Sequence, residues 1–317
     1  MEVIQVSDRP ASQAYSVAGR LLFIDCHDRR LRSLIEVLFA GWQLTPVSFP
    51  DRSPDIRISF TCDTQVPAVP PDLVQFEIAD GGQCYTGDES FYLTLQGALV
   101  QLQKADPITV TVCLPRLPEP GDPLLARVAS FAVCAALRRF GLFDLHSAGV
   151  VAPDDDKGVL IIGRSGSGKS TLALRLAMSG WSYLSDDEVL LSEVDGAVEA
   201  RGFRSFFAVT TSHASQLKTC FEPETVLGSK RRAFASPGLL LFTRLSGEEQ
   251  SQLSKLTQAE TMMRLIRACP WATYDTAIAG ANLEVLSTLA RQASAFDLFA
   301  GRDLLAPGYA ANVLSQL

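Results

Sequence analysis

The chain has 317 residues, which is enough for one large domain or for two of ordinary size. Hydrophobic residues make up 47% of it and charged residues 20%, a composition that excludes a disordered chain and can build a substantial core. The net charge of −7 argues against nucleic acid and anionic membrane surfaces as partners, because neither attracts a negatively charged protein.

The N-terminus and the cysteines favour a cytoplasmic protein. The segment MEVIQVSDRPASQAYS lacks the basic and apolar regions of a secretory signal. No apolar run approaches the ~20 residues needed to span a bilayer. The seven cysteines are scattered without a C-x-x-C pair, so we expect reduced and mostly buried thiols. Only three histidines are present, which argues against a histidine-based zinc site.

Residues 1–118 predict a small α+β domain. Alternating apolar and polar residues indicate strands, and apolar residues at helical spacing indicate a helix. We expect strands at 21–25, 55–60 and 107–115, a hairpin at 73–87 and a helix at 31–42. Four of the ten residues from 114 to 123 are prolines, which lack amide donors, so this stretch is the expected linker.

Residues 119–317 predict a second domain of α/β class. The expected order is a helix at 124–141, strands at 144–152 and 158–163, a helix at 170–180, and strands at 181–194 and 198–203. A strand at 238–245, helices at 257–269 and 281–293, and a strand at 295–301 follow. Gly141 and Gly180 are the expected ends of the first two helices, because glycine readily adopts the left-handed conformation found there.

The strand at 158–163 leads into a motif that predicts a phosphate-binding loop. The sequence GRSGSGKS, from Gly163 to Ser170, matches G-x-x-x-x-G-K-[ST] at every fixed position. Glycines let successive amides point into one concavity, and the following helix directs its positive end to the same place. Lys169 would reach the outer phosphates, and the Ser170 hydroxyl would hold Mg²⁺. The residues expected to contact the nucleotide are Gly163, Arg164, Ser165, Gly166, Ser167, Gly168, Lys169, Ser170 and Thr171.

Two aspartates and a histidine extend this binding site to a candidate catalytic site. Asp186 and Asp187 follow the loop after one helix and one strand, where many phosphate-loop proteins have an aspartate that supports Mg²⁺. At a strand end both carboxylates can reach one pocket, so one can stay on the metal while the other accepts a proton from an attacking hydroxyl. His146, on the strand before the loop strand, could orient the transferring group.

These residues together resemble the HPr serine kinase/phosphorylase family. The resemblance covers LHSAGVV and then GRSGSGKSTLALRLAMSGWSYLSDDEV, roughly residues 145–191. It implies that His146, Lys169 and Asp186 act at the active site, with Asp186 as the proton acceptor toward a protein serine. It also implies that Ser170 binds Mg²⁺ and that Asp187 supports the metal. The implied fold is a phosphoenolpyruvate-carboxykinase-like core with a mixed sheet, and family members assemble as hexamers, which implies a homo-oligomer.

The sequence departs from the family pattern after the two aspartates. The family has an E-x-R-G-L-G signature whose glutamate binds the metal, and this chain offers Glu199-Ala-Arg-Gly-Phe, closer to the aspartates than expected. The later P-G-R-N segment is reduced to Pro237-Gly238 without its arginine. The basic cluster Lys230-Arg231-Arg232 could replace that phosphate contact or could be a solvated loop. These departures resemble those of divergent HPr-kinase-related proteins, some of which modify peptides.

The sequence therefore predicts a kinase that uses ATP and Mg²⁺ and phosphorylates a hydroxyl group. The expected acceptor is a serine of a protein or peptide, or otherwise a small-molecule alcohol. A non-catalytic ATP sensor is the alternative, and it would keep the loop without depending on His146 or Asp186. A plain nucleotide hydrolase is a third reading, but it requires a water-positioning residue that the sequence does not identify.

Overall fold

A computed structural model describes residues 12–48, 52–78, 81–87, 89–153, 157–210, 218–224, 228 and 230–314. The chain divides into two compact units. One consists of Met1–Ala40 and Leu44–Ala136, and the other of Gly41–Gln43 and Leu137–Leu317. The expected boundary between residues 118 and 119 therefore lies within the first unit, because the helix that follows the proline-rich stretch packs mainly with the first unit.

The first unit is built on a mixed sheet. In order across the sheet, its strands are β3 (Thr45–Val47), β1 (Ser12–Val17), β2 (Arg20–Cys26), β4 (Ile56–Cys62), β9 (Ile108–Leu114), β8 (Ala98–Gln103), β7 (Ser90–Leu95), β6 (Gly82–Thr86) and β5 (Val74–Ile78). The central strands β2, β4 and β9 are parallel, and the other pairs are antiparallel. Their central position explains why their apolar residues are buried, as the alternation in the sequence predicted.

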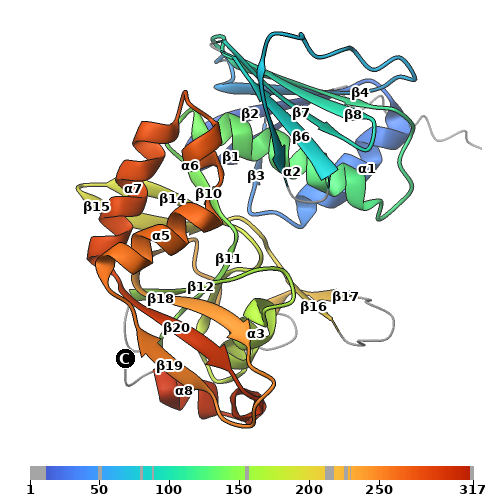
Figure 1. The fold of residues 1–317 in the computed structure, drawn as a ribbon. Coiled ribbons are helices and arrows are strands. Elements are labelled where there is room, and N and C mark those ends of the chain that lie inside the picture. The colour runs from blue at the N-terminus through green and yellow to red at the C-terminus, as the bar shows by residue number, and fades with distance from the viewer. Residues whose placement is uncertain are drawn as a thin grey trace, which may run out of the picture. The chain divides into compact units, whose positions relative to one another are not determined.

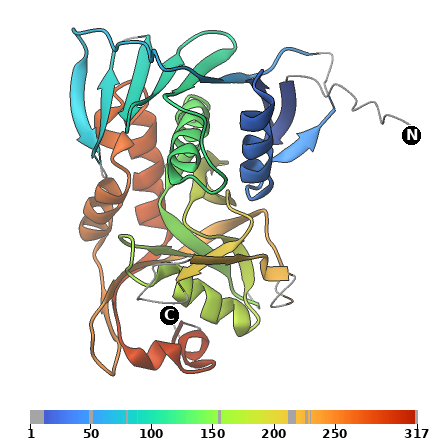
Figure 2. The ribbon, with the colours of Figure 1, turned by 90° about the vertical axis from the view of Figure 1, so that its right-hand side faces the viewer.

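Two helices cover one face of this sheet, α1 (Arg29–Ala40) and α2 (Pro123–Arg138). Tyr15 of β1 meets Phe39 of α1 edge-to-face at 5.6 Å between ring centroids, and Phe91 of β7 stacks on Phe131 of α2 at 5.7 Å. The strand registers place Tyr15 and Phe91 on the same side of the sheet, so both helices lie on that side (Figures 1 and 2). These aromatic contacts keep α2 with the first unit.

The second unit contains a larger mixed α/β assembly. Its sheet runs in the order β10 (Phe143–Leu145), β14 (Val189–Val194), β15 (Ala197–Gly202), β18 (Phe234–Leu245), β12 (Lys157–Ile162), β11 (Ser147–Val151) and β13 (Ser182–Ser185), with β20 (Ser294–Ala300) paired to β18 and to β19 (Gln252–Lys255). The pairs β12–β18 and β18–β20 are parallel, whereas the other pairs are antiparallel. A separate two-stranded ribbon consists of β16 (Phe207–Thr210) and β17 (Lys218–Phe221).

Helices lie on both faces of this second sheet. They are α3 (Lys169–Met178), α5 (Gln258–Ala268), α6 (Trp271–Tyr274), α7 (Ala279–Gln292) and α8 (Tyr309–Leu314), with the 3₁₀-helix η2 (Arg302–Leu305). Leu160 of β12 belongs to the core with α5 and α7, whereas its neighbour Ile161 belongs to the core with α3. Figure 1 shows α5, α6 and α7 on one side of the sheet and α3 on the other. Burial on both faces accounts for the continuous apolar sequence of β12.

Two strands expected as single segments are interrupted at the candidate site residues. The strand expected at 144–152 is divided into β10 and β11, and His146 lies at the break. The strand expected at 181–194 is divided into β13 and β14, with Asp186 and Asp187 between them. Both breaks separate strands that occupy different positions in the sheet. The sequence does not reveal these breaks, because buried residues lie on both sides of each one.

Other sequence expectations agree with the structure. Gly141 and Gly180 have positive φ values of 74° and 91° after α2 and α3, as expected for helix-ending glycines. All seven cysteines are thiols, five of them buried. No helix in the described part of the chain is long and apolar enough to cross a membrane.

Candidate functional site

The glycine-rich sequence connects the end of β12 to the start of α3, the strand–loop–helix context that the motif requires. Gly166 and Gly168 have φ values of 80° and 92°, in the region that favours glycine. A Cβ atom on Gly163 would lie 2.4 Å from Ser167 Oγ and 2.6 Å from the Thr243 carbonyl oxygen. Ser167 Oγ also lies 3.1 Å from Thr243 Oγ1, which ties the loop to β18. The three motif glycines are thus required by backbone conformation or by close packing.

The motif lysine folds back over its own loop. Lys169 is 5% exposed, and its Nζ donates to the carbonyl oxygens of Gly163 at 2.8 Å and Arg164 at 3.2 Å. The same Nζ lies 3.0 Å from Nε2 of His146. The break between β10 and β11 thus brings the predicted histidine into contact with the predicted lysine.

Asp186 is buried beneath the loop. The residue is only 1% exposed. Its carboxylate oxygens accept hydrogen bonds from the backbone amides of Asp187 and Ala208, each at 3.0 Å, and from the Ser170 side chain. Burial is the main cause that raises the pKa of Asp186 above its usual range, and the hydrogen bonds from Ala208 and Ser170 oppose it. A buried carboxylate therefore meets the motif hydroxyl at the start of α3.

Asp187 lies at the surface beside the histidine. It adopts a positive φ of 67°, which aspartate tolerates better than most residues, and its side chain is 53% exposed. Its Oδ1 lies 3.3 Å from Nδ1 of His146, whose side chain is 45% exposed. One residue in the left-handed conformation thus separates the environments of the two adjacent aspartates.

The two aspartates have different partners. From the sequence, Asp186 is the expected proton acceptor, and Asp187 and Ser170 are the expected metal residues. In the structure Ser170 bonds Asp186, and Asp187 instead meets His146. The reason is the turn after β13: Asp186 continues the buried course of that strand, and the positive φ of Asp187 turns its side chain to the surface.

The structure does not bring Glu199 to the loop. Glu199 forms an ion pair with Arg201 at 2.7 Å and lines a surface hollow together with Val151. Val151 pairs with Gly158, at the start of β12, whereas the loop follows the end of that strand. About four residues of extended strand, roughly 13 Å, separate these two ends of β12. Glu199 is therefore a poor candidate for a metal ligand at the loop.

The basic cluster and the Pro-Gly remnant have structural contacts. The backbone at Lys230 and Arg232 exchanges hydrogen bonds of 2.8 Å with Tyr183 of β13. Arg231 forms an ion pair with Glu224 at 2.8 Å. Pro237 pairs with Gly158 at the start of β12, away from the loop. These contacts fix the edge of the sheet.

The sequence did not predict the residues that hold the aspartate turn, the turn after β13 that contains Asp186 and Asp187. Gln43, from the short segment that joins the second unit, donates its side-chain amide to the carbonyl oxygens of Leu184 at 2.7 Å and Arg204 at 2.8 Å. The Ser185 hydroxyl accepts hydrogen bonds from the amides of Phe203 and Arg204. The only sequence signal was the glycine of the R-G-F segment, Gly202, which packs directly against this cluster.

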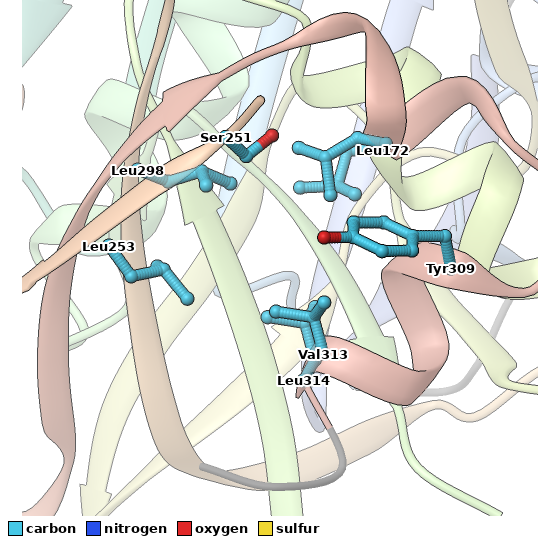
Figure 3. Close-up of a pocket in the computed structure, with 8 residues that line it drawn as sticks. Leu172, Ser251, Leu253, Leu298, Tyr309, Val313 and Leu314 are labelled. Carbon is cyan, nitrogen blue, oxygen red and sulfur yellow. The ribbon is translucent and has the colours of Figure 1, made fainter. Parts of the chain in front are cut away.

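An apolar cavity of about 230 Å³ lies beside α3. Figure 3 shows Leu172 of α3 facing Leu253 and Leu298 of β19 and β20, with Tyr309 of α8 at its side. Its lining contains no residue of the loop from Gly163 to Ser170 and neither of the two aspartates. The loop and the two aspartates form a separate, polar site.

Comparison with solved structures finds similar chains. No protein-family model and no curated protein matches the chain. The chain is similar to the HPr(Ser) kinase/phosphatase from Coxiella burnetii with a TM-score of 0.34 and 14% sequence identity, over 55% of this chain and 95% of that one. The structure is that of a mixed α/β protein with a glycine-rich strand–loop–helix site.

Proposed function

We propose that this protein is a kinase that transfers the γ-phosphoryl group of ATP to a hydroxyl group, most simply a serine of a protein or peptide. The observation that carries the proposal is the series of contacts from Lys169 through His146 to the exposed Asp187, beside the hydrogen bond between Ser170 and the buried Asp186. Nucleotide binding requires only the loop. Phosphoryl transfer also needs a proton acceptor, and the exposed carboxylate of Asp187 supplies one at the same place.

The loop and α3 would hold the nucleotide phosphates. The amides from Gly163 to Ser170 and the positive end of α3 favour an anion, and Thr171 extends this surface. Lys169, whose Nζ lies 2.8 Å from the Gly163 carbonyl oxygen, would pair with the outer phosphates. The sequence resemblance to HPr serine kinases also supports a nucleotide at this loop.

Ser170 and Asp186 suit Mg²⁺. A hydroxyl and a carboxylate already joined by a hydrogen bond offer the hard oxygen donors that this ion prefers. The buried carboxylate, with its raised pKa, also gains from a nearby cation. When bound, the ion would offset the negative charge of the phosphates.

We assign the proton acceptor to Asp187 and the metal-side role to Asp186, which exchanges the roles expected from the sequence. Asp186 is inaccessible, and its oxygens already accept three hydrogen bonds. Asp187 is exposed to an incoming hydroxyl, and His146 fixes the orientation of its carboxylate. A base must come within hydrogen-bond reach of the proton that it removes, and only Asp187 of the two can do so without rearrangement.

A phosphotransfer assay tests the proposal. Parent protein, Asp187→Asn and Asp195→Asn are incubated with Mg²⁺, radiolabelled ATP and serine-containing peptides or a protein lysate. Asp195 is the matched control, because it is an exposed aspartate with a positive φ of 51° in the β14–β15 turn. We expect Asp187→Asn to lower transfer at least ~100-fold while ATP binding persists, and Asp195→Asn to behave as the parent.

The same assay separates the kinase from the alternatives. ATP binding without transfer to any acceptor would refute the kinase and favour the non-catalytic sensor. Equal transfer by Asp187→Asn and the parent would refute Asp187 as the base. Transfer to small alcohols but not to peptides would replace the serine acceptor with a metabolite.

A further inference from the structure

The ammonium group of Lys169 already contacts acceptors of the protein itself. An ammonium group has three protons to donate, and Nζ of Lys169 has acceptors at Gly163 O, Arg164 O and His146 Nε2, all within 3.2 Å. Pairing with outer phosphates requires the ammonium to leave some of these acceptors. The observed conformation therefore competes with nucleotide binding.

The contact also defines the protonation of the imidazole ring. An ammonium group only donates, so Nε2 of His146 must accept from Lys169. The ring proton then lies on Nδ1, which faces Oδ1 of Asp187 at 3.3 Å. The donor direction is the same throughout, from Lys169 to His146 and from His146 to Asp187. Asp187 thus favours the tautomer that can hold the lysine.

From this series of contacts we infer that His146, oriented by Asp187, is a positioning residue that retains Lys169 over the loop in the nucleotide-free protein. The inference rests on the nucleotide-binding part of the proposed function and deepens it. The outer phosphates of a bound nucleotide carry negative charge, unlike a neutral imidazole, so they replace His146 as the partner of the Lys169 ammonium group. The contact between Lys169 and Nε2 of His146 is broken in the same event, whereas His146 and Asp187 can remain paired.

Retention of Lys169 by His146 predicts how the affinity for each nucleotide should change when His146 is removed. Removing His146 takes away one acceptor of Lys169 in the nucleotide-free state, and a hydrogen bond of this kind contributes a roughly five- to tenfold factor. We therefore expect His146→Ala to bind ADP and ATP roughly five- to tenfold more tightly than the parent. AMP lacks the outer phosphates that Lys169 would reach, so its affinity should stay the same.

Calorimetry with ADP, ATP and AMP on the full chain tests this pattern. His27→Ala, an exposed histidine of the first unit, is the control and should match the parent with all three nucleotides. His146→Gln keeps a side-chain acceptor and should return the ADP affinity toward the parent value. Nitrogen NMR of the ring gives an independent readout: His146 should be protonated at Nδ1 without nucleotide, and its Nε2 signal should shift when ADP is added.

The outcomes distinguish this inference from the kinase proposal. Equal or weaker binding of ADP by His146→Ala would overturn the inference, as would a gain that AMP shares. Tighter ADP binding without any phosphotransfer would support the retention of Lys169 and refute the kinase. Failure of both parent and His146→Ala to bind ADP or ATP would overturn both.

Discussion

Gly202 offers a direct test of how the aspartate turn is held. A Cβ atom at this position would lie 2.3 Å from the Leu184 carbonyl oxygen and 2.3 Å from Gln43 Nε2. Leu184 precedes Asp186 by only two residues, on the strand that leads to the turn. Gly202→Ala should therefore displace the end of β13, because a backbone oxygen cannot rotate away as a flexible side chain can.

The expected size of the effect follows from these distances. Restoring an ordinary contact of about 3.4 Å requires β13 and β15 to separate by about 1 Å, and overpacking of this kind typically costs about 1–3 kcal/mol. The hydrogen bond from Gln43 to Leu184, now 2.7 Å, would be broken as well. A displacement of about 1 Å at the aspartates should lower phosphotransfer roughly 100-fold.

Urea denaturation and phosphotransfer measure the two effects. Gly280→Ala is the matched control, because a Cβ atom at Gly280 meets nothing within 4 Å and the residue lies in α7. Alanine in a helix should stabilise that variant by up to about 1 kcal/mol, without loss of activity. Gly202→Ala with parental stability, or a destabilised variant with full phosphotransfer, would refute the role of Gly202 in fixing the turn.

Two further predictions concern titratable groups. The raised pKa of Asp186 means that its carboxyl group stabilises the fold below its usual value of 3.8 and that this contribution is lost as pH rises through the folded-state pKa. The unfolding free energy of Asp186→Asn, measured in urea without Mg²⁺, should therefore increase relative to that of the parent as pH rises from 3.8 through the folded-state pKa; a constant difference would contradict this. An aromatic disulfide reagent should modify two thiols of the native protein, the exposed Cys62 and Cys220, and all seven in denaturant. Burial raises the pKa of Cys26 to about 11, so modification of that thiol in the native protein would contradict the structure.

The parts of the site that the sequence predicted are those determined by neighbours along the chain. The apolar run before Gly163, the spacing of the glycines and the apolar helix after Lys169 define a strand, a turn and a helix locally. Each glycine has a conformational or packing requirement that no other residue meets as well. This is why the loop and α3 agree with expectation to within a residue or two.

The parts that it did not predict depend on contacts between distant segments. Nothing local distinguishes Asp186 from Asp187; their environments differ because the chain turns after β13 and Ala208 supplies an amide from another strand. Likewise, no sequence pattern connects Gln43 to Leu184 across more than a hundred residues. The apolar character of α2 predicted a helix but could not show that Phe131 stacks on Phe91 of the first unit.

The site contains two pairs of residues that are adjacent in sequence, and in each pair the two side chains have different partners. Lys169 and Ser170 are neighbours at the start of α3, and Asp186 and Asp187 are neighbours in the turn, yet Ser170 bonds the buried aspartate while Lys169 reaches the exposed one through His146. Asp186 is 1% exposed and is held by two backbone amides as well as by Ser170, so this pair suits a fixed ligand such as a metal ion. The side chains of His146 and Asp187 are about half exposed, so their contacts can break and re-form and suit steps that change during turnover. Within each pair, Lys169–Ser170 and Asp186–Asp187, the two neighbours have different roles. Exchanging those roles would require the helix or the turn to move. A conservative substitution at one position should therefore not be compensated by the residue beside it.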